Sequence, residues 1–125
     1  MKRYRYASVV LLLLAIPACG HVGQRFLVFQ IELDGQVVLE GMQGVSDIMP
    51  VDEMWDVLGK VPFSAKEGQT PPDELEGDVV VRITHVNKEL ASAKLKTLSL
   101  QPDAAGSNWS LSAAEAERVK RAAAD

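Results

Sequence analysis

The stretch that constrains the fold most strongly is FLVFQIELDGQVVLEG, residues 26–41. Apolar and polar residues alternate through residues 26–33, and this period of two is typical of a half-buried β-strand. A similar pattern returns through residues 36–41. The pair Asp34-Gly35 stands between the two halves, where it favours a tight turn. The sequence therefore predicts an antiparallel hairpin.

The register of this hairpin depends on keeping one face apolar, because a slip of one residue turns every side chain over. A two-residue loop would mix apolar and polar residues on both faces. A three-residue loop with Gly35 in a bulge pairs Ile31 with Val37 and Phe29 with Leu39, and we predict this loop. The resulting apolar face holds Leu27, Phe29, Ile31, Val37 and Leu39.

A second pair of strands is predicted later in the chain. Residues 79–86 are rich in β-branched side chains, and residues 93–100 return after a turn. The apolar phase of the returning strand shifts near Lys96, which indicates a bulge. Residues 64–78 contain four glycine or proline residues and are predicted to form a loop.

Two helices are predicted. A proline at the start and a glycine after the end bracket a short helix over residues 50–58. Ser112 and Glu115 have the spacing of a capping box, which begins a C-terminal helix ending near Ala123. The apolar residues of the short helix fall on one stripe: Val51, Met54, Trp55 and Leu58.

These elements predict an α+β fold. We expect a small antiparallel sheet of about four strands in two hairpins, with a short central helix and a C-terminal helix packed on one face. Residues 26–125 are long enough for a single small globular domain with a modest core.

Charge and cysteine content exclude some classes of function. The chain has 13 Lys and Arg residues against 17 Asp and Glu residues. Without residues 1–18, which hold three of the cations, ten remain against 17, a net charge of −7. Nucleic-acid binding depends on neutralising phosphates with Lys and Arg, so we expect no nucleic-acid partner. The single cysteine, Cys19, excludes an internal disulfide.

The N-terminus has the pattern of a secretory signal. Lys2, Arg3 and Arg5 precede a twelve-residue run of apolar or small residues, 7–18, which ends before Cys19. A membrane-spanning helix needs about 20 apolar residues, so this run is too short to stay as one.

The segment Leu14-Ala-Ile-Pro-Ala-Cys19 resembles the lipobox of bacterial lipoproteins. The resemblance implies that residues 1–18 are a signal peptide, and that Cys19 carries a diacylglycerol and an acyl chain such as palmitate. Residues 19–25 would then be the lipidated cysteine and a short tether. Gly20 stands where an aspartate would favour the inner membrane, so we expect the outer membrane, facing the periplasm. The alternative is an ordinary signal cleavage near Ala18 or Gly20.

No pattern for catalysis or metal binding emerges. The only histidines are His21 and His85, too few for a histidine-based metal site. Three acidic residues of the predicted short helix are explained as its solvated face. No nucleophile elbow or phosphate loop is present. We therefore predict a protein that is not an enzyme, without catalytic residues, metal or cofactor.

Methionine and tryptophan gather in residues 42–63. Such side chains fill cores and also form binding hot spots, and we favour the core. The candidate partner-binding residues are Met49, Met54, Trp55 and Phe63.

These observations favour a membrane-anchored envelope lipoprotein that acts as a non-enzymatic protein-binding module in assembly, stabilisation or inhibition. The alternative is a periplasmic domain that binds a small ligand between the sheet and the C-terminal helix. An exposed apolar patch around Met54 and Trp55 would favour the first function. A deep apolar cavity behind Phe29 and Ile31 would favour the second.

Overall fold

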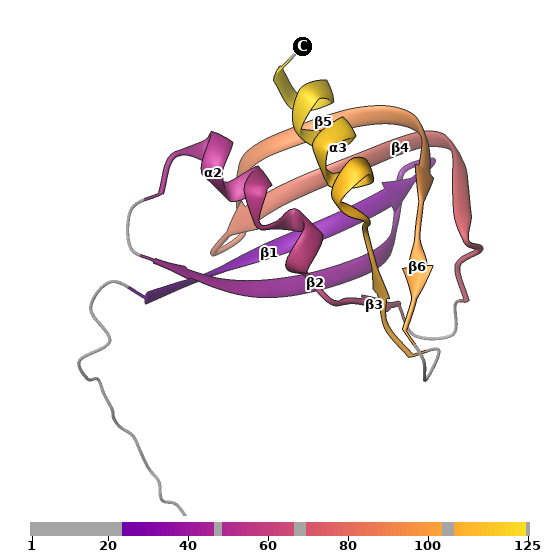
Figure 1. Cartoon of the computed structure of the whole chain (residues 1–125), viewed down its shortest axis with the longest axis horizontal. Helices are drawn as coiled ribbons and strands as arrows, with labels where there is room; N and C mark the ends of the chain where they lie inside the picture. The colour runs from indigo at the N-terminus through magenta and orange to yellow at the C-terminus, as the bar shows by residue number, and fades with distance from the viewer. Residues whose placement is uncertain (1–23, 47–48, 67–69, 104–106, 125) are drawn as a thin grey trace, which may run out of the picture.

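The computed structural model describes residues 24–46, 49–66, 70–103 and 107–124. Most of these residues lie in strands (Figure 1). In chain order the elements are β1 (Gln24–Leu33), β2 (Gln36–Ser46), α2 (Val51–Asp56), the 3₁₀ helix η2 (Leu58–Lys60), β3 (Phe63–Ala65), β4 (Glu74–His85), β5 (Lys88–Ser99), β6 (Gln101–Pro102), β7 (Trp109–Ser110) and α3 (Ala113–Ala124).

The strands form one antiparallel sheet in the order β5-β4-β1-β2-β3-β7-β6. Its two outer strands, β5 and β6, are separated in the chain only by Leu100. One continuous segment therefore joins both edges, and the sheet curls into a half-barrel (Figure 1). The predicted four-stranded sheet with a central helix is wrong, because β3, β6 and β7 are too short to produce an alternating pattern.

The first hairpin turns over two residues, not three. Leu33 pairs with Gln36. Between them, Asp34 and Gly35 have φ values of 51° and 89°. Positive φ at both central residues is what a type I′ turn requires, and Asp-Gly is a favoured pair for it. The predicted three-residue loop is therefore wrong.

A β-bulge aligns the apolar residues instead. The register shifts between Ile31 and Glu32, so that Glu32 pairs with Val37 and Ile31 with Leu39. Val38 is the extra residue that makes this shift. The predicted apolar face is confirmed for the four of its members that are fully buried. The prediction is wrong for Val37, which pairs with Glu32 on the opposite face, while Val38 packs against the core. The buried members are Leu27, Phe29, Ile31 and Leu39.

The second hairpin is longer than predicted. The loop predicted for residues 64–78 is wrong at both ends, because β3 includes residues 64–65 and β4 begins at Glu74. The register shifts where Gly77 and Asp78 face Lys96. The irregularity predicted near Lys96 is therefore confirmed, with the extra residue on β4. Gly77 has φ of 136°, a backbone conformation that side-chain-bearing residues rarely adopt.

The predicted short helix is split into α2 and η2. Met54, Trp55 and Leu58 are buried as predicted, whereas Val51 is 40% exposed. The segment lies over the concave face of the sheet, beside α3 (Figure 1). None of the helices in the described part of the chain combines the length and the hydrophobicity needed to cross a membrane.

The C-terminal helix begins at its predicted cap. Ser112 Oγ accepts a hydrogen bond of 3.2 Å from the backbone N–H of Glu115. The Glu115 carboxylate accepts hydrogen bonds from the Ser99 N–H at 2.9 Å and from Arg118 at 2.8 Å. This carboxylate therefore attaches the first turn of α3 to the end of β5.

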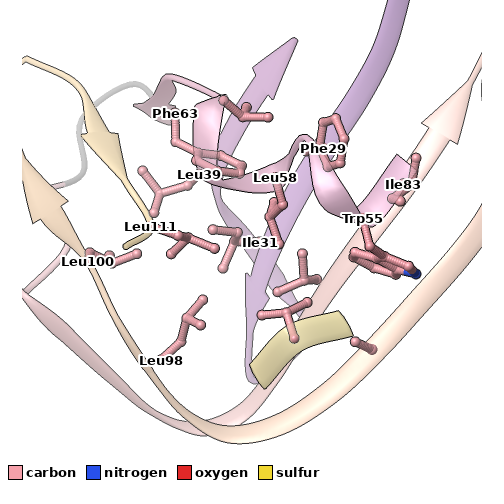
Figure 2. Packing of buried hydrophobic residues seen from close by; sticks show 14 of the residues in the cluster. Phe29, Ile31, Leu39, Trp55, Leu58, Phe63, Ile83, Leu98, Leu100 and Leu111 are labelled. Atoms are coloured by element: carbon pink, nitrogen blue, oxygen red, sulfur yellow. The ribbon is translucent and has the colours of Figure 1, made fainter. Parts of the chain in front are cut away.

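The core fills the space between the concave face and the helices. Figure 2 shows Trp55 and Leu58 pointing into the same cluster as Phe29 and Ile31 of β1. Val119 of α3 is fully buried in this cluster. Among the described residues, all the buried side chains are apolar.

Gly41 is required where the segment before β3 crosses β2. A Cβ atom at this position would lie 2.5 Å from Val61 Cγ1 and 2.7 Å from the Pro62 carbonyl oxygen. Real Cβ atoms do not approach other heavy atoms so closely. The absence of a side chain at Gly41 therefore allows Val61 and Phe63 to reach the core, where both are fully buried.

We predict that Trp55→Ala lowers the free energy of unfolding by about 3–5 kcal/mol, because it removes a large side chain from a packed core. Urea denaturation of the two proteins measures the difference. Val51→Ala in the same helix is the control, with an expected change within about 0.5 kcal/mol. Equal stability of Trp55→Ala and the parent would contradict the packing described above.

We predict that Gly41→Ala destabilises the fold by about 1–3 kcal/mol or more, because Val61 and Pro62 must move away from β2. Gly59→Ala is the matched control, since the nearest atom to its added Cβ, that of Ala116, lies 3.7 Å away. Thermal unfolding of both variants tests this. A Gly41→Ala variant as stable as Gly59→Ala would show that the crossing tolerates a side chain.

Candidate functional site: a groove on the outer face

The candidate partner-binding residues predicted from the sequence lie in or against the core. Met54, Trp55 and Phe63 are 4%, 2% and 0% exposed. Met49 is partly buried and packs on the same cluster. Met54 and Trp55 themselves therefore offer a partner almost no exposed surface. Cys19 lies outside the described residues.

The space predicted for a small ligand is occupied by side chains. Phe29 and Ile31 are fully buried, and Leu98 and Val119 fill the space between the sheet and α3. In the described part of the chain, the inner side of the half-barrel is thus packed with core side chains.

A shallow hollow of about 280 Å³ separates α2 and η2 from α3. Lys120 Nζ donates a hydrogen bond of 2.8 Å to Asp56 Oδ1, which links the two helices at this hollow. This hydrogen bond raises the pKa of Lys120 above its ordinary value, and the charge of Asp56 acts in the same direction. The hollow is thus lined by a pair of charges that neutralise each other.

The outer face carries a groove of about 770 Å³, which we call the outer groove. It lies between β1 and β2 on one side and the segment of β3 on the other. Its floor and walls are largely apolar, and Glu40, Ser64 and Lys66 add polar groups. The complete lining is Val28, Glu40, Gly41, Met42, Pro62, Ser64, Ala65 and Lys66.

Strand register explains why apolar side chains lie on this outer face. Val28 pairs with Met42 on one side and with Thr84 on the other. All three lie on the face opposite Leu27 and Phe29 because side chains alternate along a strand. Met42 is 58% exposed, so its side chain forms part of the accessible surface of the groove.

The neighbouring polar residues are held in place by one another. Gln30 donates a hydrogen bond of 2.8 Å to Glu40, and Ser64 donates one of 3.1 Å to Asn108. The Lys66 ammonium group makes no ion pair within the described part of the chain. The groove therefore combines an apolar floor with an available positive charge.

The groove lies beside an open sheet edge. Strand β3 pairs with β2 only at Leu39, Glu40 and Gly41, although β2 continues to Ser46. Beyond Gly41, no other described strand pairs with β2 on its β3 side (Figure 1). Unpaired backbone groups at a sheet edge can pair with a strand from another chain.

Several titratable side chains of the outer face are paired. Across the four described ranges, no three His, Cys, Asp or Glu residues lie close enough together to hold a metal ion. On the outer face, the carboxylates of Glu32 and Glu89 are engaged by Arg82. His85 Nδ1 lies 3.2 Å from the carbonyl oxygen of Phe26, so this imidazole is engaged with the backbone of β1.

Comparisons with protein-family models, with curated proteins and with solved structures found no match to this chain.

Sequence reasoning missed the groove, although a signal was present. In the strand alternation, the face that carries Gln30 and Glu40 also carries three apolar residues: Phe26, Val28 and Met42. Apolar residues on the polar side of a strand indicate a surface that contacts something other than water.

Proposed function

We propose that this protein is a lipid-anchored envelope lipoprotein that binds another protein through the outer groove. In this proposal residues 1–18 are the signal peptide and Cys19 carries the lipid at the periplasmic face of the outer membrane. The observation that carries the binding function is Met42, exposed in an apolar groove beside an open edge of β2.

The groove suits an extended segment of a partner protein. Such a segment could pair with the free edge of β2 through backbone hydrogen bonds and place alternate side chains over Met42 and Val28. Lys66 at the rim would favour an acidic residue in the segment. A peptide added to a sheet edge gains affinity from its main chain and specificity from such side-chain contacts.

The anchor would strengthen a modest interaction. Two or more acyl chains hold a protein stably on a membrane, whereas one holds it only marginally. Confining the domain to the same surface as its partner raises the effective concentration of each for the other. Function would then depend on both Cys19 and the groove, and each can be tested separately.

We predict that Cys19→Ser abolishes lipidation, leaves an uncleaved precursor and removes the acyl-dependent membrane anchoring. Labelling cells with a radioactive fatty acid, followed by fractionation and intact-mass measurement, tests all three effects. Ser8→Ala, within the signal segment, is the control and is expected to be processed normally. Normal processing of Cys19→Ser would exclude the lipoprotein assignment.

We predict that a photo-crosslinking amino acid at Ser64, on the wall of the groove, captures one discrete envelope protein in cells. Adding Met42→Glu should abolish the product, because a carboxylate would be desolvated on the apolar floor. The same probe at Arg121 on α3, which is 68% exposed, is the control. Equal products from positions 64 and 121, or no effect of Met42→Glu, would contradict binding at the groove.

A further inference from the structure

Two exposed apolar residues lie near one end of the β1–β4 pair. Phe26 is 57% exposed and Val86, in the β4–β5 turn, is 79% exposed. The last β1–β4 pair is Val28 with Thr84, and Phe26 and Val86 each lie two residues beyond it, at the same end of the two strands. The contact between His85 and the Phe26 carbonyl holds these segments together. We call Phe26 and Val86 the tip.

Val86 occupies a position that the fold does not favour for it. Its φ is 52°, and that of Asn87 is 63°. Positive φ is uncommon for non-glycine residues and is a marked outlier for a β-branched one. Turns of this kind prefer asparagine, aspartate or glycine. A strained valine that is 79% exposed adds little to the core, so its apolar side chain is better explained by an external contact.

The position of the tip in the chain identifies the contact. Phe26 follows Cys19 by seven residues, so the intervening chain spans at most about 25 Å. A lipid on Cys19 would therefore keep this end of the sheet near the bilayer. The Asp34-Gly35 turn is at the other end of β1 and β2, about one strand length away from Phe26 (Figure 1).

We propose that the tip docks onto the lipid surface that holds the anchor. This inference rests on the lipid anchor of the proposed function. Phe26 and Val86 would enter the interfacial region of the bilayer, which would bring the exposed position 88 next to them to the membrane surface. Two contacts, the anchor and the tip, would fix the orientation of the domain. The outer groove would then open sideways, where a partner in the same envelope layer can reach it.

Depth-dependent fluorescence tests the docking. The full chain is expressed with Lys88→Cys, and the mature lipidated protein is reconstituted into vesicles of phosphatidylethanolamine and phosphatidylglycerol. An acylated Cys19 has no free thiol, so an environment-sensitive fluorophore reacts only at position 88. A label at Gln36→Cys, at the far end of the same strands, is the matched control. We expect brominated lipids to quench the label at position 88 several-fold more than the label at position 36.

Removing the apolar side chains of Phe26 and Val86 tests whether the label is quenched because the tip docks onto the bilayer or only because position 88 lies near it. Phe26→Ser with Val86→Asn, in the Lys88→Cys protein, should reduce quenching to the level of position 36. Val86→Asn places a residue that tolerates positive φ in the turn, so the double variant should unfold at no lower temperature than a Phe26→Ser variant. Unchanged quenching in the double variant would overturn the docking of the tip.

The mass of Cys19 in the same preparation separates the two proposals. An acylated Cys19 with equal quenching at positions 88 and 36 overturns the docking and leaves the anchor standing. An unmodified Cys19 overturns the anchor, and with it the docking that depends on it. Acylation together with selective quenching that requires Phe26 and Val86 supports both.

Discussion

At Gly41, strand β2 packs so closely against the segment before β3 that the position must lack a side chain. Several other features of the structure follow from this contact. With no side chain there, the chain after η2 can cross β2 and bury Val61 and Phe63. That crossing places α2 and η2 over the concave face, where Trp55 completes the core (Figure 2). It also continues the sheet into β3, which pairs with β7 and through it with β6. Both the packing of the core and the continuation of the sheet into β3 therefore require that position 41 carries no side chain.

The curl of the sheet divides the molecule into two faces with different roles. The concave face is closed by helices and filled with apolar side chains, which accounts for its stability. The outer face keeps Phe26 and Met42 exposed, and removing their apolar surface from water would be favourable. In our proposals a partner segment covers the groove and lipid covers the tip. The tip lies at the Phe26 end of the strands, whereas the groove lies near their middle, beside Val28 and Glu40.

Local patterns predicted some of these features and not others. The alternation around Phe29 indicated the buried face, and the serine–glutamate spacing at Ser112 marked the start of α3. The register was mispredicted because a bulge at Val38, inside the strand, brings the apolar residues of β1 and β2 onto one face. A loop of a different length would align the same residues, and the sequence pattern does not distinguish the two. Burial of Met54 and Trp55 agrees with their helical spacing, which cannot by itself tell a core from a hot spot. The groove was missed because it joins β2 to a segment 20 residues later.

Features that depend on neighbours along the chain could be predicted from the sequence: the buried face of β1, a turn near Asp34-Gly35 but not its length, and the cap of α3. The number of strands, the place where the sheet closes and the exposed side chains that share a surface depend on contacts between distant segments. The physical reason is that strands of two or three residues have no stability of their own. They exist because distant segments supply their hydrogen-bonding partners, as Trp109 does for Phe63.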